Sequence, residues 1–241
     1  GKLRHIASLS GGWDSSVMWL FLTGYLPGYA VDGIEGTFVD PGKERQATYQ
    51  VLDALDALTG VRIARLRGPT WDEALEKHKW FLPFHHARWC TKEFKIAPFL
   101  EYIGNDQVIS YIGLRADEPG RTGYLGDDGD NVTACYPLRE MGITKADVIW
   151  LGREVGLPEP AEWSCSCCPF RPHVMWVKTI EEMPEAAEWC AWVEGQKQVN
   201  GAGEYTWVRG YTMRELIDDP MLRSQIRRRY WSKNQHQSQQ A

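Results

Sequence analysis

His5-Ile-Ala-Ser-Leu-Ser-Gly-Gly-Trp-Asp-Ser-Ser16 is the stretch from which the fold of this chain can be predicted. A short apolar run ends at Ser10, two glycines follow, and the strongly apolar segment Val17–Leu22 comes soon after them. This order predicts a strand, a tight turn and a helix. Because glycine has no Cβ, the turn can direct several N–H groups into one concavity beside the positive end of the helix dipole. The stretch therefore predicts a phosphate site, although a glycine–serine turn without any ligand is the simpler alternative.

The composition of the 241 residues is that of a globular protein, with 43% hydrophobic and 24% charged residues. The formal net charge is −5, so any contact with nucleic acid would have to be local. No apolar run approaches the roughly 20 residues of a membrane span, and no signal peptide precedes the first strand. We therefore expect a cytoplasmic protein without a membrane partner, whose six cysteines are reduced thiols or metal ligands.

Predicted strands and helices alternate as far as Pro160. The later strands are predicted at Ile34–Val39, Val61–Leu66, Gln107–Leu114 and Cys135–Leu138, and the later helices at Lys43–Leu58, from Thr70 towards Lys79, and at Thr144–Val155. Such alternation predicts an α/β fold with a parallel sheet covered on both faces. Between these elements, residues 116–131 form a long segment without an element of its own, which is typical of a functional lid or of a disordered loop. We expect an α/β domain over residues 1–160 and an irregular, cysteine-rich and basic extension over residues 161–241, packed on that domain.

Several charged residues are predicted at the carboxyl ends of the strands, where ligands bind in open parallel sheets. The glycine loop, Asp40 and Arg115 follow the first, second and fourth strands and should meet at one edge. Asp40 could equally be only a turn residue. The further cations near the predicted strand ends are Arg88, Lys95 and Arg121.

A guanidinium group fits phosphate with two hydrogen bonds, and an ammonium group supplies a point charge. A solvated surface pair would equally explain any one of these cations. Glu118 lies between Arg115 and Arg121 and could simply orient the two guanidinium groups.

Cysteines cluster in Trp163-Ser-Cys-Ser-Cys-Cys-Pro-Phe170. Cys165 and Cys168 have the CxxC spacing that brings two thiolates onto one metal at a tight turn. Candidates for the remaining ligands are Cys90, Cys135, Cys167 and Cys190, of which Cys190 looks most like a core residue. An iron–sulfur cluster, a structural zinc, a redox dithiol and unliganded buried cysteines all remain open on the spacing alone.

The C-terminal segment from Met221 to Ala241 contains no acidic residue. Its basic residues are Arg223, Arg227, Arg228, Arg229 and Lys233, with Tyr230 and Trp231 among them. Basic residues interleaved with aromatic ones can bind phosphates and stack on bases. A solvated, frayed end explains the same pattern.

The loop S-G-G-x-D-S-S resembles the PP-loop of the ATP pyrophosphatase superfamily. Further stretches between residues 6 and 168 resemble, in the same order, segments of the phosphoadenosine phosphosulfate (PAPS) reductase family. These stretches are Phe38–Glu44 with Thr48-Tyr49, Arg88-Trp-Cys-Thr91 with Lys95 and Pro98, Gly113–Glu118 with Arg121, and Tyr136-Pro-Leu followed by Gly142-Ile-Thr. Pro41 stands where that family has a threonine.

The resemblance implies a five-stranded parallel sheet of order 3-2-1-4-5 and a site for ATP with Mg²⁺. The residues that would hold pyrophosphate are Ser10, Gly11, Gly12, Ser15 and Ser16. Asp14 with Mg²⁺ would offset its charge, and Asp40 would contact ribose, adenine or the metal. Arg88 and Lys95 would bind phosphate, whereas Arg115 and Arg121, with Glu118 between them, would hold the second substrate.

Relatives with the same loop and a C-x-x-C-P-F segment cleave ATP to AMP and pyrophosphate, and some carry a four-cysteine iron–sulfur cluster. The resemblance therefore implies an ATP-dependent sulfurtransferase with such a cluster on Cys90, Cys165 and Cys168 and on either Cys135 or Cys167. The implied partners are a sulfur donor such as a cysteine desulfurase, DNA or RNA as a candidate substrate, and a second copy of the chain as a candidate assembly.

Two other functions stay open. One is a sulfonucleotide reductase, although the E-C-G-x-H segment of true reductases is absent, since no cysteine follows Cys190. The other is a nucleotide- or nucleic-acid-binding module without turnover. Release of pyrophosphate would separate this module from the transferase.

Overall fold

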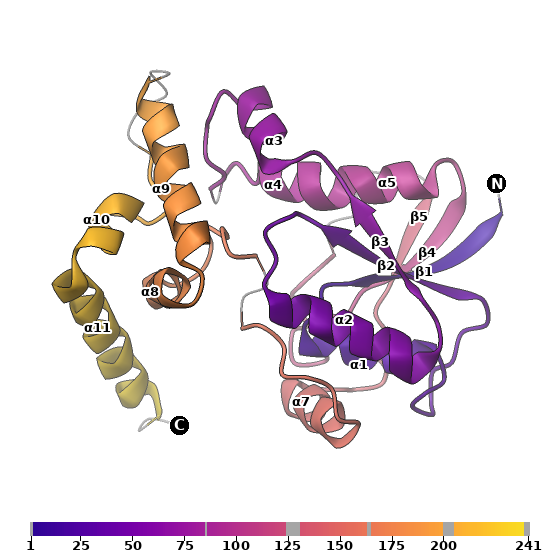
Figure 1. Cartoon of the computed structure of the whole chain (residues 1–241). Helices are drawn as coiled ribbons and strands as arrows, with labels where there is room; N and C mark the ends of the chain where they lie inside the picture. Colours follow the sequence, from indigo (N-terminus) through magenta and orange to yellow (C-terminus); the bar gives the residue numbers. More distant parts are fainter. Residues whose placement is uncertain (1, 85, 124–130, 163–164, 200–204, 239–241) are drawn as a thin grey trace. The chain divides into compact units, whose positions relative to one another are not determined.

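The computed structural model describes residues 2–84, 86–123, 131–162, 165–199 and 205–238 (Figure 1). The chain forms two compact units. The first, called the sheet unit below, comprises Gly1–Pro69 and Thr91–Ser164. The second, called the helical unit, comprises Thr70–Cys90 and Cys165–Ala241. No helix in the described ranges is long and apolar enough to cross a membrane.

The sheet unit contains five parallel strands in the order β3-β2-β1-β4-β5, which confirms the predicted fold. The strands are β1 (Leu3–Leu9), β2 (Ile34–Asp40), β3 (Ile63–Arg67), β4 (Gln107–Tyr111) and β5 (Val132–Cys135). The prediction for the last strand was wrong in its position. The strand ends at Cys135, and Pro137 begins the short helix α6 (Pro137–Glu140), where the missing N–H of proline costs nothing.

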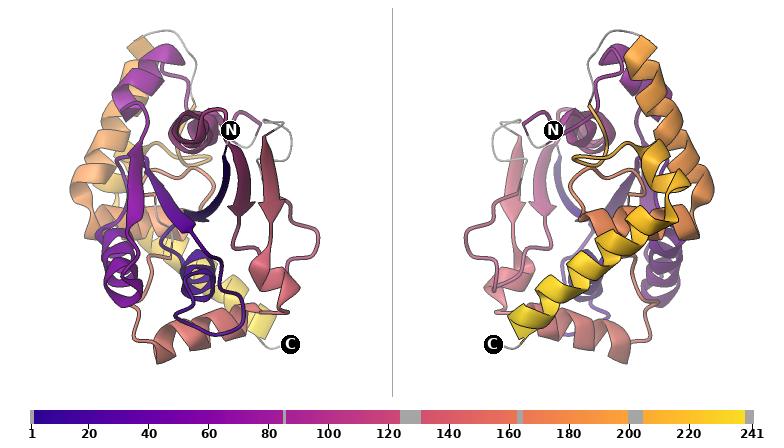
Figure 2. Two further views of the ribbon diagram at one scale, coloured as in Figure 1. Left: turned by 90° about the vertical axis from the view of Figure 1, so that its right-hand side faces the viewer. Right: turned by 90° about the vertical axis from the view of Figure 1, so that its left-hand side faces the viewer.

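Helices cover both faces of this sheet (Figures 1 and 2). On one face lie α1 (Trp13–Leu22), α2 (Gln46–Thr59) and α7 (Lys145–Glu154), and on the other lie the π-helix η1 (Lys92–Ile96) and α5 (Ala97–Ile103). The alternation of side chains along β1 explains both contacts. Ala7 and Leu9 join the core beneath α1, whereas Ile6 packs with Phe99 and Ile103 of α5.

The η1–α5 segment was not predicted from the sequence. Pro98 falls in the middle of its apolar pattern and suggests a break. In the structure Pro98 occupies the first turn of α5, where proline is tolerated.

The helical unit contains α3 (Trp71–Lys77), α8 (His173–Glu182), α9 (Pro184–Val199), α10 (Met213–Asp218) and α11 (Pro220–Ser238). The short helix α4 (Trp89–Thr91) falls where the sequence passes from this unit into the sheet unit. The C-terminal extension is thus far more regular than the sequence indicated.

Tryptophan rings hold the helical unit together. Trp71 meets Trp89, Trp189 and Trp207 edge to face at centroid distances of 5.9, 5.7 and 5.9 Å. Residues 70–90 therefore group with the C-terminal half of the chain. This grouping differs from the predicted domains, which placed them within residues 1–160.

Candidate functional site

The glycine loop connects β1 to α1 as predicted, and its shape depends on Gly11. This residue has φ +69°, a left-handed conformation that side chains disfavour. A Cβ at Gly11 would lie 2.7 Å from Cγ2 of Thr48 and 3.2 Å from its carbonyl oxygen. Any larger residue would therefore be strained and would push the loop away from α2.

Hydrogen bonds of Ser15 close the loop. The Ser15 hydroxyl accepts the Ser10 N–H at 3.1 Å, lies 3.1 Å from the Ser10 hydroxyl, and donates to the Gly12 carbonyl at 3.4 Å. Gly12 precedes α1 and offers no side chain to cap it. In the described part of the chain, the N–H groups of Gly12, Trp13 and Asp14 have no hydrogen-bond partner. These donors at the positive end of α1 are suited to an anion.

Ser16 does not share this arrangement. Its side chain is fully buried, and its hydroxyl has no partner among the described residues. Its N–H already donates to the Gly12 carbonyl at 3.1 Å. Of the predicted pyrophosphate ligands, Ser10, Gly11, Gly12 and Ser15 form the loop, whereas Ser16 lies in the core behind it.

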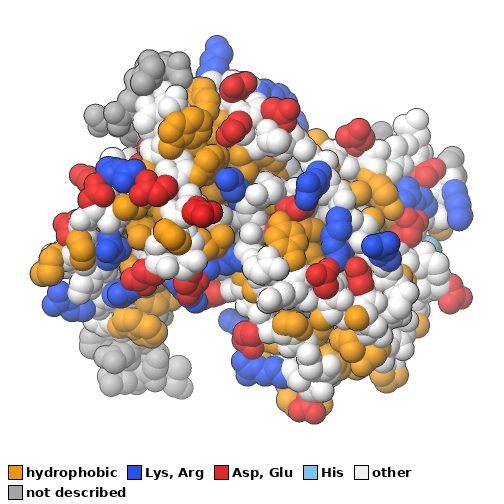
Figure 3. Space-filling view, viewed as in Figure 1, with side chains coloured by type: hydrophobic (Ala, Val, Ile, Leu, Met, Phe, Trp, Pro, Cys, Tyr) orange, Lys and Arg blue, Asp and Glu red, His pale blue; other side chains and the backbone are white. Residues whose placement is uncertain are grey.

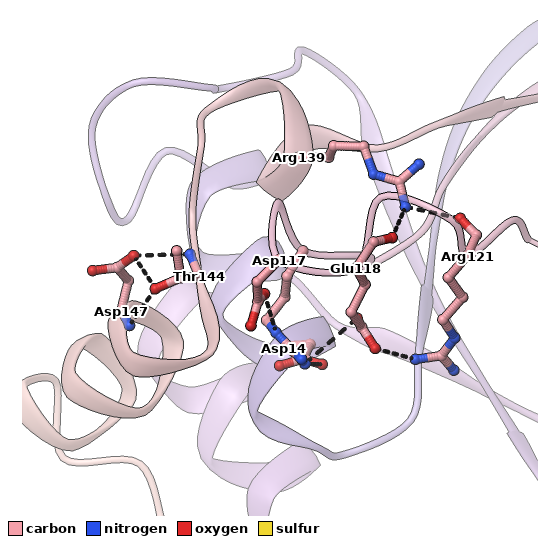
Figure 4. A network of polar contacts seen from close by, with 8 residues as sticks. Asp14, Asp117, Glu118, Arg121, Arg139, Thr144 and Asp147 are labelled. Atoms are coloured by element: carbon pink, nitrogen blue, oxygen red, sulfur yellow. Dashed lines mark hydrogen bonds and ion pairs between the residues drawn. The ribbon is translucent and has the colours of Figure 1, made fainter. Parts of the chain in front are cut away.

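Arg115 joins the loop to the segment that follows β4 (Figure 4). Its Nη1 lies 2.5 Å from Asp14 Oδ2 and 3.5 Å from Glu118 Oε2, and its Nε lies 2.9 Å from Asp117 Oδ1. The close approach depends on Gly113, where a Cβ would lie 3.0 Å from the Ser15 nitrogen. The structure thus brings Asp14 of the glycine loop and Arg115 together, as predicted for one edge of the sheet, with Glu118 beside them. Asp40, the third residue predicted there, makes no hydrogen bond or ion pair with either of them among the residues that the structure describes.

Arg121 and Arg139 complete this network. Arg121 Nη1 donates to Glu118 Oε1 at 2.9 Å. Arg139, which follows β5, donates from Nη2 to the carbonyls of Glu118 and Arg121, at 2.8 Å each (Figure 4). The sequence analysis missed Arg139, because a side chain that binds backbone carbonyls belongs to no chemical motif. Its only signal was its place directly after the segment Tyr136-Pro-Leu.

The network carries three carboxylates, of Asp14, Asp117 and Glu118, and three guanidinium groups, of Arg115, Arg121 and Arg139, beside the loop. Burial raises the pKa of Asp14, and the charge and hydrogen bond of Arg115 offset only part of this effect. By contrast, the hydrogen bond from Arg115 lowers the pKa of Asp117. A polyphosphate placed on the loop would add negative charge beside carboxylates whose charge these arginines already balance, and a divalent cation could neutralise the added charge.

Asp40 ends β2 and is almost fully buried. Its Oδ1 accepts the Gly42 N–H at 2.8 Å and the Tyr49 hydroxyl at 3.0 Å, and Arg67 lies 3.7 Å from its Oδ2. Burial and the hydrogen bond to Asp40 both raise the pKa of Tyr49. Asp40 therefore shapes the turn after β2, and a role in ligand binding stays a prediction.

A largely apolar pocket of about 270 Å³ opens beside the loop, within the sheet unit. Ser10 belongs to both the loop and the pocket. Other lining residues come from the ends of β1 and β2 and from η1–α5, among them Thr37, Val39, Lys95 and Phe99. The site thus combines anion donors with an adjacent apolar cavity that has one cation, Lys95, in its wall.

Arg88 lies in the helical unit, with its guanidinium 4.5 Å above the ring of Phe170. The predicted R-W-C-T…K motif therefore spans both units, because Lys95 belongs to the sheet unit. A phosphate contact of Arg88 stays a prediction.

All six cysteines lie in described segments, and none forms a disulfide. Cys165 and Cys168 form the predicted tight turn, in which the Cys168 N–H donates to the Cys165 carbonyl at 3.3 Å. Cys167 is buried, with its Sγ 3.6 Å from that of Cys190. Burial raises the pKa of the Cys190 thiol, and the neighbouring Cys167 raises it further. The prediction that Cys190 is a core residue is confirmed.

Cys135 belongs to the sheet unit, at the end of β5. Its thiol contacts the Tyr29 hydroxyl and Glu140 Oε1, at 3.4 Å each, and burial raises its pKa. Among the described residues, no group of three or more histidine, cysteine, aspartate or glutamate side chains is arranged to hold a metal ion. Within the helical unit, the cysteines as arranged therefore do not fit a four-thiolate centre.

The basic C-terminal segment is the helix α11, and part of its charge has an internal role. Arg223 donates to the carbonyls of Leu216 and Ile217 at the end of α10, at 2.7 and 2.5 Å. Arg227 pairs with Glu181 of α8. Of the basic residues whose side chains are described, Arg228 and Arg229 remain for an external partner, so a nucleic-acid contact of this segment stays a prediction.

Two uncharacterized proteins of Methanocaldococcus jannaschii, MJ0066 and MJ0973, are each 32% identical to this chain, over 116 and 96 residues. These matches cover 47% and 40% of the chain, but only 23% and 22% of the two relatives. The chain therefore matches less than a quarter of the length of each relative.

Two solved structures are similar to parts of this chain. A PAPS reductase from Candida auris, in complex with phosphate, has a TM-score of 0.48 and 14% identity, over 66% of this chain and 75% of that one. The U34-tRNA thiolase NcsA from Methanococcus maripaludis, with its [4Fe-4S] cluster, has a TM-score of 0.47 and 18% identity, over 85% and 74% of the chains.

The sequence profile of the phosphoadenosine phosphosulfate reductase domain matches residues 4–124. The matched half of the chain contains β1 to β4, the glycine loop and the segment from Arg115 to Arg121. The chain belongs to the phosphoadenosine phosphosulfate reductase domain family.

Proposed function

We propose that this chain binds ATP with Mg²⁺ at the glycine loop and cleaves it to AMP and pyrophosphate in an ATP-dependent sulfurtransferase reaction. The observation that carries the proposal is the row of N–H groups at Gly12, Trp13 and Asp14, which lack partners in the described structure. Backbone donors at a helix start suit the β,γ-pyrophosphate of a nucleotide. The adjacent apolar pocket would accept the adenosine part.

The charges beside the loop favour ATP with Mg²⁺ over a sulfonucleotide without a metal. Arg115 already faces Asp14, Asp117 and Glu118, so its charge is neutralised before any ligand arrives. A phosphosulfate ligand would gain little from such an arginine. Mg²⁺ commonly binds between one or two protein carboxylates and the phosphates of a substrate, and Asp14, in the first turn of α1, would supply such a carboxylate.

The reaction follows from these roles. An acceptor oxygen attacks the α-phosphorus of ATP, the bond from that phosphorus to the bridging oxygen breaks, and pyrophosphate leaves with its charge held by the loop N–H groups. A sulfur nucleophile then attacks the activated carbon, and AMP departs with the former acceptor oxygen. Arg121 and Glu118 would orient the acceptor, and Lys95 would offset charge on the α-phosphate. A sulfur donor such as a cysteine desulfurase would supply the sulfur.

The iron–sulfur cofactor stays a separate prediction, and no step above depends on it. The helical unit itself offers the Cys165–Cys168 turn and Cys90, and these thiols would have to come together around a metal. Iron, zinc and acid-labile sulfide should be measured after purification without oxygen, for the wild type and for Cys168→Ala. Iron with sulfide that is lost in the variant would support the cluster, whereas zinc without sulfide would contradict it.

The proposed reaction is tested by incubating the protein with Mg²⁺, sulfide and ATP labelled at the α-phosphate, together with candidate acceptors. We expect label in AMP and an equal amount of pyrophosphate. Release of ADP and phosphate would contradict the proposal. Release of sulfite from PAPS with a thiol reductant would instead establish the reductase.

A further inference from the structure

A second surface of interest lies in the helical unit, where aromatic rings reach the solvent beside α3 and α9. We call it the aromatic patch, and its members are Trp80, Phe81, Phe84, Trp192 and Tyr205. Phe84, Trp192 and Tyr205 are 37%, 47% and 50% exposed, an unusual exposure for such large apolar groups. Figure 3 shows hydrophobic side chains over α9 and beside α3, next to side chains of both charges.

The rings of the aromatic patch are organised rather than scattered. Trp80 meets Trp192 edge to face at 5.5 Å, and Phe81 meets Phe84 and Tyr205 at 5.3 and 5.0 Å. The rings of Phe84 and Tyr205 are within 24° of parallel, with centroids 6.5 Å apart. The rings thus form two groups on the same unit, which begin from successive residues. Trp80 packs with Trp192, and Phe81 packs with Phe84 and Tyr205.

The backbone that presents these rings is strained. Lys79 and Trp80 have φ values of +52° and +62°, a left-handed conformation that non-glycine residues rarely adopt. Two hydrogen bonds hold them there, from the Lys79 N–H to the Glu76 carbonyl and from the Trp80 N–H to the Leu75 carbonyl. Such strain persists where the surrounding structure fixes it and is frequent at binding sites.

The charge of the same stretch differs from that of the whole chain. From residue 77 to residue 92 there is no acidic residue, although the formal net charge of the protein is −5. The stretch carries Lys77, Lys79, Arg88 and Lys92 and the histidines His78, His85 and His86, of which His85 lies outside the described residues. Lys79, His86 and Arg88 are exposed within the helical unit.

We propose that the aromatic patch binds single-stranded nucleic acid through stacking of unpaired bases. Each base offers a flat π-face to an exposed ring, and the neighbouring cations would bind the phosphates between the bases. A duplex would not fit, because its bases are already stacked on one another. A purely apolar protein partner would fit the rings but would make no ion pair with the neighbouring lysine and arginine side chains. The proposal concerns the helical unit and does not depend on the ATP reaction of the sheet unit.

Fluorescence anisotropy with labelled 12-nucleotide oligo(dT) and oligo(U) tests the proposal on the full chain. Loss of one stacking ring reduces affinity by about tenfold, so we expect that loss for Trp192→Ala and for Tyr205→Ala. Trp150→Ala is the matched control, because its ring is 61% exposed and lies outside the patch, on α7. We expect this control to bind as the wild type does.

The salt dependence of binding provides a second measurement. Lys79→Gln should reduce the slope of log K against log salt by about 0.7, the value for one phosphate contact on a single strand. The variant removes the charge with a side chain only one atom shorter, and because Lys79 is exposed it should keep the melting temperature of the wild type.

Three results would overturn the proposal. These are equal affinity for a duplex of the same length, an equal loss of affinity in Trp150→Ala, and no binding of either oligonucleotide by the wild type. A wild-type dimer that Tyr205→Ala dissociates, together with unchanged oligonucleotide affinity, would assign the patch to a second copy of the chain.

Discussion

The glycine loop and the cysteine turn (residues 165–168) are both tight turns of small residues. They differ in that the loop offers backbone N–H groups to a ligand, whereas the cysteine turn packs side chains into the core. In the loop, backbone N–H groups at the start of α1 lack partners in the described structure, and the Ser15 hydroxyl closes the turn from within. In the cysteine turn, reactive and polar groups are directed into the core of the helical unit. Cys167 faces Cys190 in the core, and the buried Arg171 donates to the Ser166 carbonyl at 2.5 Å.

This difference teaches which of the two turns is ready for a ligand. The loop exposes donors that a phosphate can satisfy without any rearrangement. In the cysteine turn, the Cys167 thiol and the Ser166 carbonyl already make contacts that pack the helical unit. We therefore propose the loop as the binding site and expect the cysteine turn to contribute to the packing of the helical unit. The variants below test the loop and the packing of that unit.

The largest effect on the loop should come from Gly11→Val. The new side chain would clash with Thr48 and distort the row of N–H donors. Loss of a pre-organised anion contact costs about 10²–10³-fold, so we expect that loss in affinity for a non-hydrolysable ATP analogue, measured by calorimetry. Gly195→Ala is the control, because a Cβ there meets nothing within 4 Å on α9. An unchanged affinity in Gly11→Val would contradict the assignment.

A large effect on the helical unit should come from Glu194→Ala. The buried carboxylate accepts the N–H groups of Trp207 and Met213 at 2.9 and 2.7 Å. Each buried donor left unsatisfied costs about 1–3 kcal/mol, so we expect the free energy of unfolding to fall by at least about 2 kcal/mol in urea titration. Glu188→Ala breaks only an exposed pair with Arg214 and should cost less than about 1 kcal/mol. Equal losses in both variants would refute this role of Glu194.

A smaller effect is expected for Arg139→Gln, which tests whether the segment after β4 positions a substrate. The variant loses two charge-assisted hydrogen bonds to the carbonyls of Glu118 and Arg121. We expect pyrophosphate formation to slow by about tenfold while affinity for ATP stays nearly unchanged, because the loop itself is untouched. Arg153→Gln, which breaks an exposed pair with Glu159, should match the wild type in both measurements. An equal loss of affinity and rate in Arg139→Gln would indicate a general structural role instead.

The smallest effect concerns the stability contribution of Asp14. Because burial raises its pKa, the folded protein binds the Asp14 proton more tightly than the unfolded chain does. The associated stability is present at acidic pH and is lost as pH rises from the ordinary aspartate range through the raised pKa. Asp14→Asn should therefore gain in melting temperature relative to the wild type across that window, while its Mg²⁺-dependent affinity for ATP falls. A wild type that gains stability relative to Asp14→Asn over the same rise would contradict the assigned pKa direction.

The sequence predicted the sheet and the glycine loop because both follow from local patterns. Apolar runs, glycines and caps specify each strand and helix in turn, and parallel order then brings Asp14 and Arg115 together. The helical unit depends on contacts between distant tryptophans, such as Trp71 with Trp207, which no local pattern reveals. For the same reason the sequence did not show that Ser16 points into the core, that Arg139 binds carbonyls, or that Cys135 and Cys167 lie in different units.

The central claim is that the loop selects a triphosphate with Mg²⁺. Calorimetric titration of the wild type with a non-hydrolysable ATP analogue, with and without Mg²⁺, tests it most directly when adenosine 3′,5′-bisphosphate is titrated in parallel. We predict one site for the ATP analogue, tighter with Mg²⁺ than without it, and weaker binding of the bisphosphate. Tighter binding of the bisphosphate, or binding of the ATP analogue that Mg²⁺ does not strengthen, would contradict the account.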